Sequence, residues 1–182
     1  MNQRENVAAL ACGLAGDVVR TFGEVRLRVF GTSMVPSVLP GDLISVQRAG
    51  ISEISIGEIV LYTRAERLFA HRVVAHHGGP EHLRLITRGD RLRRNDPPVT
   101  SNELLGRVIS VVRGGCKIDF APLDRVWMLP LLHLLRTSDY ATFAYTRLVT
   151  FLAAGVRHGV PGQFVPRHDG PPCAERASEC RV

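Results

Sequence analysis

A serine at position 33 lies in the run GTSMVPSVLPGD, which covers residues 31–42 and is rich in glycine and proline. Glycine permits backbone angles that other residues avoid, and proline stiffens the chain that follows it, so this composition predicts a rigid loop. A serine hydroxyl is a weak nucleophile unless a neighbouring group takes its proton. The loop therefore predicts a site for an activated serine, provided that the chain supplies a base.

His71 is the base that we expect. The one lysine of the chain, Lys117, lies beyond the last strand that we predict, so a lysine base is not expected. His71 lies in the strand-like run LFAHRVVA (residues 68–75), on the same face as Phe69 and Val73. A titratable ring on an apolar face needs a partner, and imidazole accepts a proton near neutral pH. The alternative is a core histidine that bonds a backbone carbonyl.

Two aspartates, Asp90 and Asp96, follow in the run ITRGDRLRRNDPPV (residues 86–99). Either carboxylate could orient the imidazole and stabilise its charged form, as the third member of a catalytic triad does. Each also has a plain structural interpretation, because Asp90 follows Gly89 and Asp96 precedes two prolines, and such positions favour turns. The spacing alone leaves both aspartates open.

Short alternating runs of apolar and polar residues must position these groups. Such alternation predicts β-strands, and the expected strands cover residues 24–29, 43–47, 58–63, 68–75, 83–88 and 106–112. Residues 4–21 predict a helix, and two more helices that meet near residues 137–139 are expected within residues 124–156. We therefore predict a mainly β fold, one sheet or barrel with flanking N- and C-terminal helices.

The same pattern divides the chain into four parts. We expect an N-terminal helical segment over residues 1–23, a β-domain over 24–115, a C-terminal helical segment over 116–156 and a disordered tail over 157–182. Two interpretations stay open for the apolar helices of residues 124–156. In the first, these helices cover the β-domain or a second copy of the chain. In the second, they contact a membrane or a partner protein.

The composition narrows the classes of function. The net charge of +6 comes almost entirely from arginine, and no nucleic-acid-binding pattern accompanies it, so we expect no nucleic-acid partner. Four scattered cysteines without a C-x-x-C pair predict neither a disulfide framework nor a zinc site, and we expect no metal and no cofactor. The apolar stretches show no membrane span and no secretion leader, which predicts a cytoplasmic protein, with membrane association as the open alternative.

Taken together, the three runs resemble the motif boxes of the signal peptidase I and LexA-like serine peptidase superfamily, in order and in spacing. They resemble most its serine–histidine branch, which includes the catalytic subunit of the eukaryotic signal peptidase complex. The matching boxes are Ser33-Met34-Val35-Pro36, Gly41-Asp42, His71-Arg72-Val73, and Gly89-Asp90 with Asp96. The resemblance covers about residues 24–113 and implies the β-rich fold of that superfamily.

The resemblance also implies a role for the matched residues. Ser33 would be the nucleophile, His71 the general base and Asp96 the group that orients the ring. The resemblance favours a structural role for Asp90 in its loop, and we keep Asp90 as the alternative third member of the triad. The box of Gly41 and Asp42 would shape a turn rather than react.

The oxyanion hole is where this chain departs from the bacterial enzymes of the superfamily. Those enzymes place a serine two residues before the nucleophile, and Gly31 stands there in this chain. The oxyanion would then be bound by the backbone N–H of Ser33, with help from the Thr32 hydroxyl. Met34 and Pro36 would lie beside the nucleophile, near the pocket for a small substrate residue.

We therefore expect a serine endopeptidase that cleaves a specific protein or leader peptide through an acyl-enzyme. The alternative is a catalytically silent module that holds a peptide or protein in the same groove. Signal peptidases anchor their catalytic domain with an N-terminal helix that spans the membrane. In this chain the corresponding segment, residues 4–21, is too short and too polar for such a span, which argues against a literal signal peptidase. LexA-type self-cleaving repressors use a lysine base, which argues against that kind of activity here.

Overall fold

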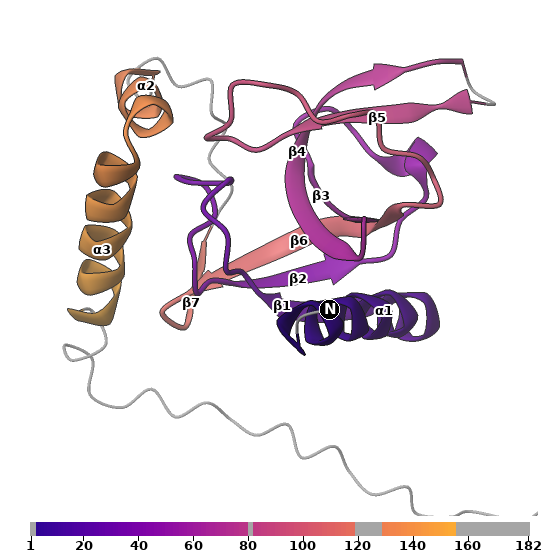
Figure 1. Cartoon of the computed structure of the whole chain (residues 1–182), viewed down its shortest axis with the longest axis horizontal. Coiled ribbons are helices and arrows are strands. Elements are labelled where there is room, and N and C mark those ends of the chain that lie inside the picture. Colours follow the sequence, from indigo (N-terminus) through magenta and orange to yellow (C-terminus); the bar gives the residue numbers. More distant parts are fainter. Residues whose placement is uncertain (1–2, 80–81, 119–128, 156–182) are drawn as a thin grey trace, which may run out of the picture.

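Seven strands form one antiparallel sheet in the computed structural model, which describes residues 3–79, 82–118 and 129–155 (Figure 1). The strands are β1 (Glu24–Arg28), β2 (Leu43–Gln47), β3 (Ile59–Arg64), β4 (Arg67–His77), β5 (Arg84–Arg88), β6 (Leu104–Arg113) and β7 (Cys116–Ile118). Their order across the sheet is β1-β2-β6-β3-β4-β5, and β7 pairs with β6. The helices are α1 (Gln3–Phe22), α2 (Leu129–Thr137) and α3 (Asp139–Gly155), with a short 3-10 turn, η1 (Ile51–Glu53). The mainly β prediction is confirmed.

The six predicted strands correspond to β1 to β6, and the predicted helix over residues 4–21 corresponds to α1. Strand β7 was missed, because it lies at the start of the segment 116–156 that was expected to be helical. Gly114 and Gly115 have φ of +60° and +91°, and they form a two-residue turn that returns the chain along β6. The sheet therefore continues past residue 115. The tail predicted over residues 157–182 lies outside the described residues.

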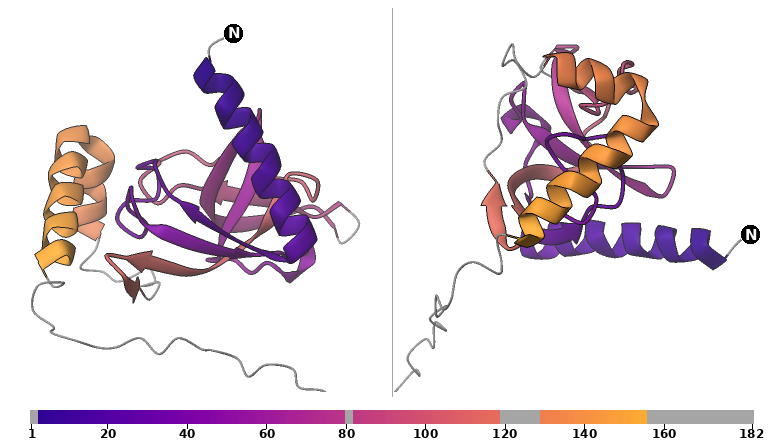
Figure 2. Two further views of the ribbon diagram at one scale, coloured as in Figure 1. Left: turned by 90° about the horizontal axis from the view of Figure 1, so that it is seen from below. Right: turned by 90° about the vertical axis from the view of Figure 1, so that its left-hand side faces the viewer.

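The sheet is curved (Figure 2). Strand β3 is buried on both faces, because an apolar cluster packs on each side of it. Alternate residues of a strand point to opposite faces, so Ile59 and Leu61 pack in one cluster while Val60 and Tyr62 pack in the other. Helix α1 adds the fully buried Val19 to the first cluster. The face of the sheet that carries Tyr62 is called the Tyr62 face here. It is shielded from water by the second cluster, which includes the buried Ile54, Leu85 and Val99.

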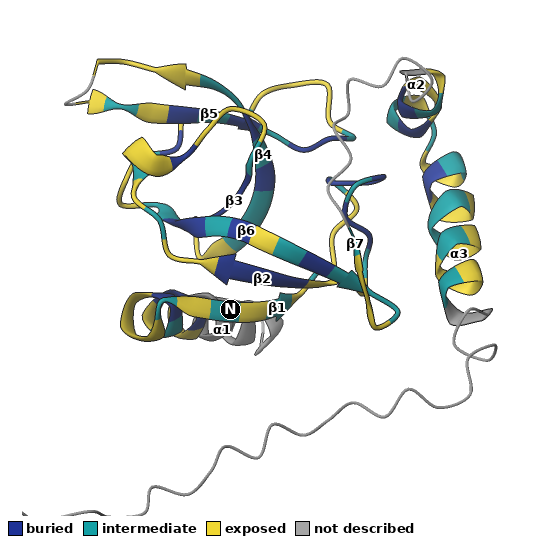
Figure 3. Ribbon diagram, turned by 180° about the vertical axis from the view of Figure 1, so that it is seen from behind, coloured by how far each residue is buried: buried dark blue, intermediate teal, exposed yellow. Residues whose placement is uncertain are grey.

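Helices α2 and α3 form a helix pair beside the β-domain, and Ser138 separates them, as expected near residues 137–139 (Figure 1). The fully buried Leu135 of α2 packs against the loop between β1 and β2, so the helix pair covers part of the β-domain. Exposed positions recur along α3 (Figure 3), and its exposed large apolar side chains are Tyr140, Phe143, Leu148, Phe151 and Leu152. None of the helices in the described ranges combines the length and apolar character that crossing a membrane requires.

Candidate active site

The loop between β1 and β2, residues 29–42, is called the serine loop here, and hydrogen bonds close it at its neck. The Val29 amide donates to the Asp42 carbonyl at 2.9 Å, and the Gly41 amide donates to the Val29 carbonyl at 2.7 Å. The buried Asp42 carboxylate accepts from Nη2 of Arg113 in β6 at 2.7 Å. Gly41 has a φ of +94°, which favours glycine. Gly41 and Asp42 thus shape the turn into β2, as predicted.

Apolar side chains anchor the serine loop on two sides. Met34 and Val38 belong to the apolar cluster that includes α1, while Val35 and Leu39 pack against Leu135 of α2. Each of these five side chains is at most 2% exposed. The serine that directly precedes Met34 is therefore carried by a loop that is fixed to the sheet and to the helix pair.

Met34 and Pro36 are two buried residues of the serine loop. The peptide bond before Pro36 is cis. Both residues therefore have an anchoring position in the interior of the protein. Their role at the pocket for a substrate residue stays a prediction.

Three residues that are far apart in the sequence meet at the edge of the serine loop. Ser33 Oγ lies 2.9 Å from His71 Nε2, and His71 Nδ1 lies 2.6 Å from Asp96 Oδ2. An ionised carboxylate only accepts hydrogen bonds, so Nδ1 carries the hydrogen of the neutral ring and Nε2 is free to accept the serine proton. The structure thus brings Asp96 to the ring, together with the serine and the histidine that the sequence singled out.

His71 lies in the middle of β4 with its side chain on the Tyr62 face, and it is 4% exposed. Its ring meets Tyr62 and Phe69 edge-on, with centroid separations of 6.2 Å and 6.0 Å. Val73 packs in the same cluster, so the predicted face for His71 is confirmed. These contacts fix the plane of the ring, while its two nitrogens bond the polar side chains of Ser33 and Asp96.

Asp96 is held in place by Thr87 of β5. Thr87 Oγ1 donates to Asp96 Oδ2 at 2.8 Å, and the Asp96 amide donates to the Thr87 carbonyl at 2.8 Å. Burial raises the pKa of the Asp96 carboxyl, but the hydrogen bonds from His71 and Thr87 outweigh this effect and bring the pKa below its usual range. Asp96 is therefore ionised at neutral pH, beside a ring whose charged form it would stabilise.

Tyr62 of β3 is a neighbour of the ring that the sequence analysis missed. Its hydroxyl lies 3.4 Å from His71 Nδ1 and 3.5 Å from Thr87 Oγ1. Burial raises the pKa of Tyr62 to about 12, with a further contribution from the Asp96 charge, so this hydroxyl stays protonated. Tyr62 and Thr87 could have been noticed in the sequence, because each is a polar residue at an inward position of a predicted strand. Alternation alone does not tell which inward positions of different strands become neighbours.

Asp90, the alternative third member, pairs with Arg72 and not with the ring. Its buried carboxylate accepts from Nε and Nη2 of Arg72, both at 2.9 Å. Arg72 also donates to Ser37 Oγ of the serine loop at 3.2 Å, and the Asp90 carbonyl accepts from Nη2 of Arg136 in α2 at 2.9 Å. Asp90 therefore ties β4, the loop after β5, the serine loop and α2 together.

Gly89 packs directly on Ser33. A Cβ at position 89 would lie 2.7 Å from the Ser33 carbonyl oxygen and 3.0 Å from the Ser33 Cβ. We expect Gly89→Ala to displace Ser33 from His71 and to slow the labelling of the serine by a fluorophosphonate about 10²-fold, because a misplacement of about 1 Å can cost that much. Intact-mass spectrometry against time measures the labelling rate.

The matched control for this substitution is Gly13→Ala in α1, where an added Cβ meets nothing within 4 Å. This variant should be labelled at the rate of the wild-type protein. A Gly89→Ala protein that also reacts at the wild-type rate would contradict the expectation that close packing at Gly89 fixes Ser33.

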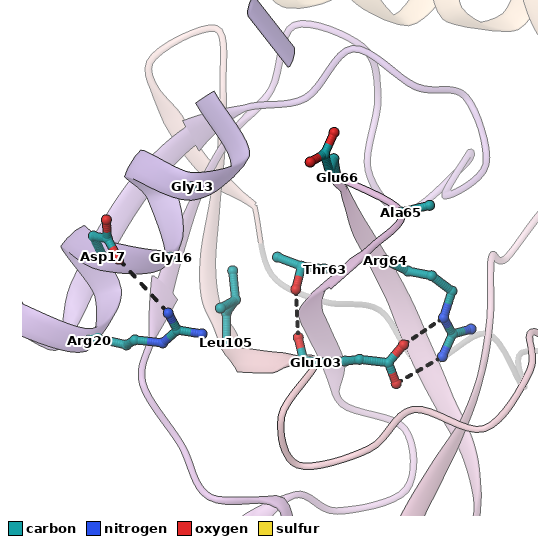
Figure 4. Close-up of a pocket in the computed structure, with 10 residues that line it drawn as sticks. All are labelled: Gly13, Gly16, Asp17, Arg20, Thr63, Arg64, Ala65, Glu66, Glu103 and Leu105. Atoms are coloured by element: carbon teal, nitrogen blue, oxygen red, sulfur yellow. Dashed lines mark hydrogen bonds and ion pairs between the residues drawn. The ribbon is translucent and has the colours of Figure 1, made fainter. Parts of the chain in front are cut away.

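A separate hollow of about 460 Å³ lies between α1 and the hairpin of β3 and β4 (Figure 4). No member of the Ser33 site lines it, and two of its charged residues pair with each other, since Arg64 Nε donates to Glu103 Oε1 at 2.7 Å. That hydrogen bond lowers the pKa of Glu103 to about 2.

Across the described ranges, no group of three or more His, Cys, Asp or Glu side chains could hold a metal ion.

No family model matches this chain, and no curated protein matches it either. The resemblance of the three sequence runs to signal peptidases therefore stays an expectation. What the site can do follows from Ser33, His71 and Asp96 and from the residues that hold them.

Proposed function

We propose that this protein is a serine endopeptidase in which Ser33 is the nucleophile, His71 the general base and Asp96 the carboxylate that orients the ring. One observation carries the proposal. An unbroken chain of hydrogen bonds runs from Ser33 Oγ through both ring nitrogens of His71 to Asp96 Oδ2, with lengths of 2.9 Å and 2.6 Å. This order of groups is the one that acyl transfer by an activated serine requires.

In the first half of the proposed reaction, Ser33 Oγ attacks the carbonyl carbon of a peptide bond while its proton passes to His71 Nε2. A carbon–oxygen bond forms, and the carbonyl oxygen takes the negative charge. When this intermediate collapses, the carbon–nitrogen bond breaks and His71 gives the proton to the leaving amine. The acyl group is then an ester on Ser33, and the amine product is free to leave.

In the second half, water takes the place of the amine. His71 accepts a proton from the water, whose oxygen attacks the acyl carbon, and the ester bond to Ser33 breaks as the proton returns to Oγ. One water is consumed for each peptide bond that is cleaved. Asp96 does not take the proton. It holds the hydrogen of the neutral ring on Nδ1 and stabilises the imidazolium form.

The proposal includes the β-fold of signal peptidases and LexA-like peptidases. It is supported by where the three matched runs lie, since they fall on the serine loop, on β4 and on the loop after β5, and these meet at Ser33. From the resemblance, we propose a specific protein or leader peptide as the substrate, cut after a small residue.

Labelling with a fluorophosphonate probe tests the nucleophile and separates an enzyme from a silent binding module. We expect one probe per chain, with the modified residue identified as Ser33 by peptide mass spectrometry. Ser33→Ala removes only the hydroxyl oxygen and should take up no probe, whereas the exposed Ser101→Ala should react like the wild-type protein. A wild-type protein that is not labelled, or that is labelled at another residue, would overturn the proposal.

A further inference from the structure

Arg91, in the loop after β5, connects the serine loop to the helix pair. On the loop side, its amide donates to the Ser33 carbonyl at 2.9 Å and its Nη1 donates to Thr32 Oγ1 at 3.2 Å. On the helix side, its Nε donates to the Leu135 carbonyl at 3.0 Å and its Nη2 forms an ion pair with Asp139. The Arg91 side chain is 18% exposed. The guanidinium group therefore has a partner in each of three segments.

The hydrogen-bond roles in the pair of Arg91 and Thr32 have only one assignment. A guanidinium group has no acceptor, so Arg91 donates and Thr32 Oγ1 accepts. The hydrogen of the Thr32 hydroxyl is then left for another acceptor, and a cation at the oxygen makes the hydroxyl a stronger donor. Because the planar guanidinium is held at Nε and Nη2 by the helix pair, the position of Nη1 is fixed as well.

The proposed reaction needs such a donor. Attack by Ser33 would create an oxyanion that the Ser33 amide can bind, and Gly31 has no side chain to supply a second donor. Thr32 lies between these two residues in the sequence. A preorganised donor at a developing oxyanion is worth about 10²–10³ in rate. The Thr32 hydroxyl is the neighbouring group that can make this contribution.

We propose that the Thr32 hydroxyl donates to the oxyanion and that Arg91 is a positioning residue that holds and polarises this hydroxyl. The inference rests on the proposed function, because it assigns a role within the same reaction. It also makes the helix pair part of the working site. The guanidinium is held where α2 ends and α3 begins, by the Leu135 carbonyl and by Asp139.

A double-mutant cycle on the full chain tests whether Arg91 acts through Thr32. The variants are Thr32→Val, Arg91→Lys and the pair, and the measurement is kcat and KM for a short-chain p-nitrophenyl ester. Thr32→Val keeps the shape of the side chain and should lower kcat about 10²-fold with little change in KM. Arg91→Lys keeps the charge but loses the planar group, and we expect about a tenfold lower kcat. The double variant should match Thr32→Val within about twofold, because its hydroxyl is already absent.

Two further variants guard against a merely structural explanation. Thr32→Ser restores the hydroxyl and should stay within about threefold of the wild-type kcat. Arg94→Lys changes an exposed arginine of the same loop and should leave kcat unchanged. The thermal unfolding midpoint of each variant reports whether the fold is kept. The positioning role itself is tested by a lower kcat at little-changed KM, which the midpoint does not report.

The possible results separate this inference from the proposed function. Losses that multiply in the double variant, or full activity in Thr32→Val or in Arg91→Lys, would overturn the inference while Ser33 is still labelled in the wild-type protein. Failure to label wild-type Ser33 at all would overturn the proposed function and this inference with it. A slower Arg91→Lys, a double variant no slower than Thr32→Val, and activity kept in Thr32→Ser together support it.

Discussion

Replacing His71 with glutamine is expected to slow fluorophosphonate labelling of Ser33 by about 10⁴- to 10⁶-fold, the range reached when the base of a serine triad is lost. The glutamine amide fills much of the same space and can still bond the serine, but it does not accept a proton at neutral pH. Ser33 would then keep its hydrogen during attack and remain a weak nucleophile. The labelling rate and the rate of p-nitrophenyl ester hydrolysis both measure the effect.

The control for this prediction is His76→Gln, which changes an exposed histidine of the same strand. It should react at the wild-type rate. Because His71 is buried, the unfolding midpoint of His71→Gln must be measured with the rates. A folded His71→Gln protein that keeps more than about a tenth of the wild-type rate would rule out His71 as the base.

Asp96→Asn should lower the same rates about 10⁴-fold, because the amide no longer fixes the hydrogen of the ring on Nδ1. An asparagine that turns its NH₂ group to Nδ1 moves the ring hydrogen to Nε2, where it faces Ser33 Oγ and prevents proton transfer. The loss of charge also removes the stabilisation of the imidazolium. Kinetics of ester hydrolysis, with the fold checked by circular dichroism, measure the effect.

Asp90→Asn is the informative comparison, since Asp90 was the alternative third member. Asp90 pairs with Arg72, so its replacement leaves a largely buried guanidinium without its ion pair and should destabilise the fold by about 3 kcal/mol. We expect its labelling rate to remain within about tenfold of the wild-type rate at a temperature where it is folded. Equal rate losses in Asp90→Asn and Asp96→Asn would show that the ring is not oriented by Asp96 alone.

The pKa of Asp96 adds a pH signature to this comparison. Because the folded-state pKa lies below the usual range, Asp96 stabilises the fold above the pKa of an unfolded aspartate, about 3.9. This contribution is lost as the pH falls from there through the folded-state pKa. In Asp96→Asn the contribution is absent at every pH, so the wild-type protein should lose its stability advantage over this variant below about pH 4.

The positions of the serine and the histidine could be predicted from the sequence because they depend on local features. Glycine and proline around Ser33 fix a loop wherever the rest of the chain lies, and alternation in residues 68–75 assigns His71 to the apolar face of its strand. The strand pattern likewise gave a mainly β fold. These features need no knowledge of which strands are neighbours.

The remaining parts of the site depend on the order of strands in the sheet. Thr87 reaches Asp96 because the loop after β5 runs back along that strand, and Tyr62 reaches the ring because β3 pairs with β4. Spacing could not choose between two aspartates six residues apart. The contacts of Arg91 could not be predicted either, because its partners lie in α2, α3 and the serine loop, which are distant in the sequence.

The apolar cluster that joins the serine loop to the helix pair has a consequence for how the molecule opens. It is smaller than the two clusters of the sheet, and it consists of Val35, Leu39 and Leu135 with Leu131, Tyr145 and Val149 around them. Regions with less buried apolar area open at lower free energy than the rest of a protein. A fluctuation that releases α2 and α3 would uncover the serine loop while the strands stay paired. The backbone amides of that loop would then exchange hydrogen with solvent together with those of the helices, and the proposed activity would be lost before the sheet unfolds.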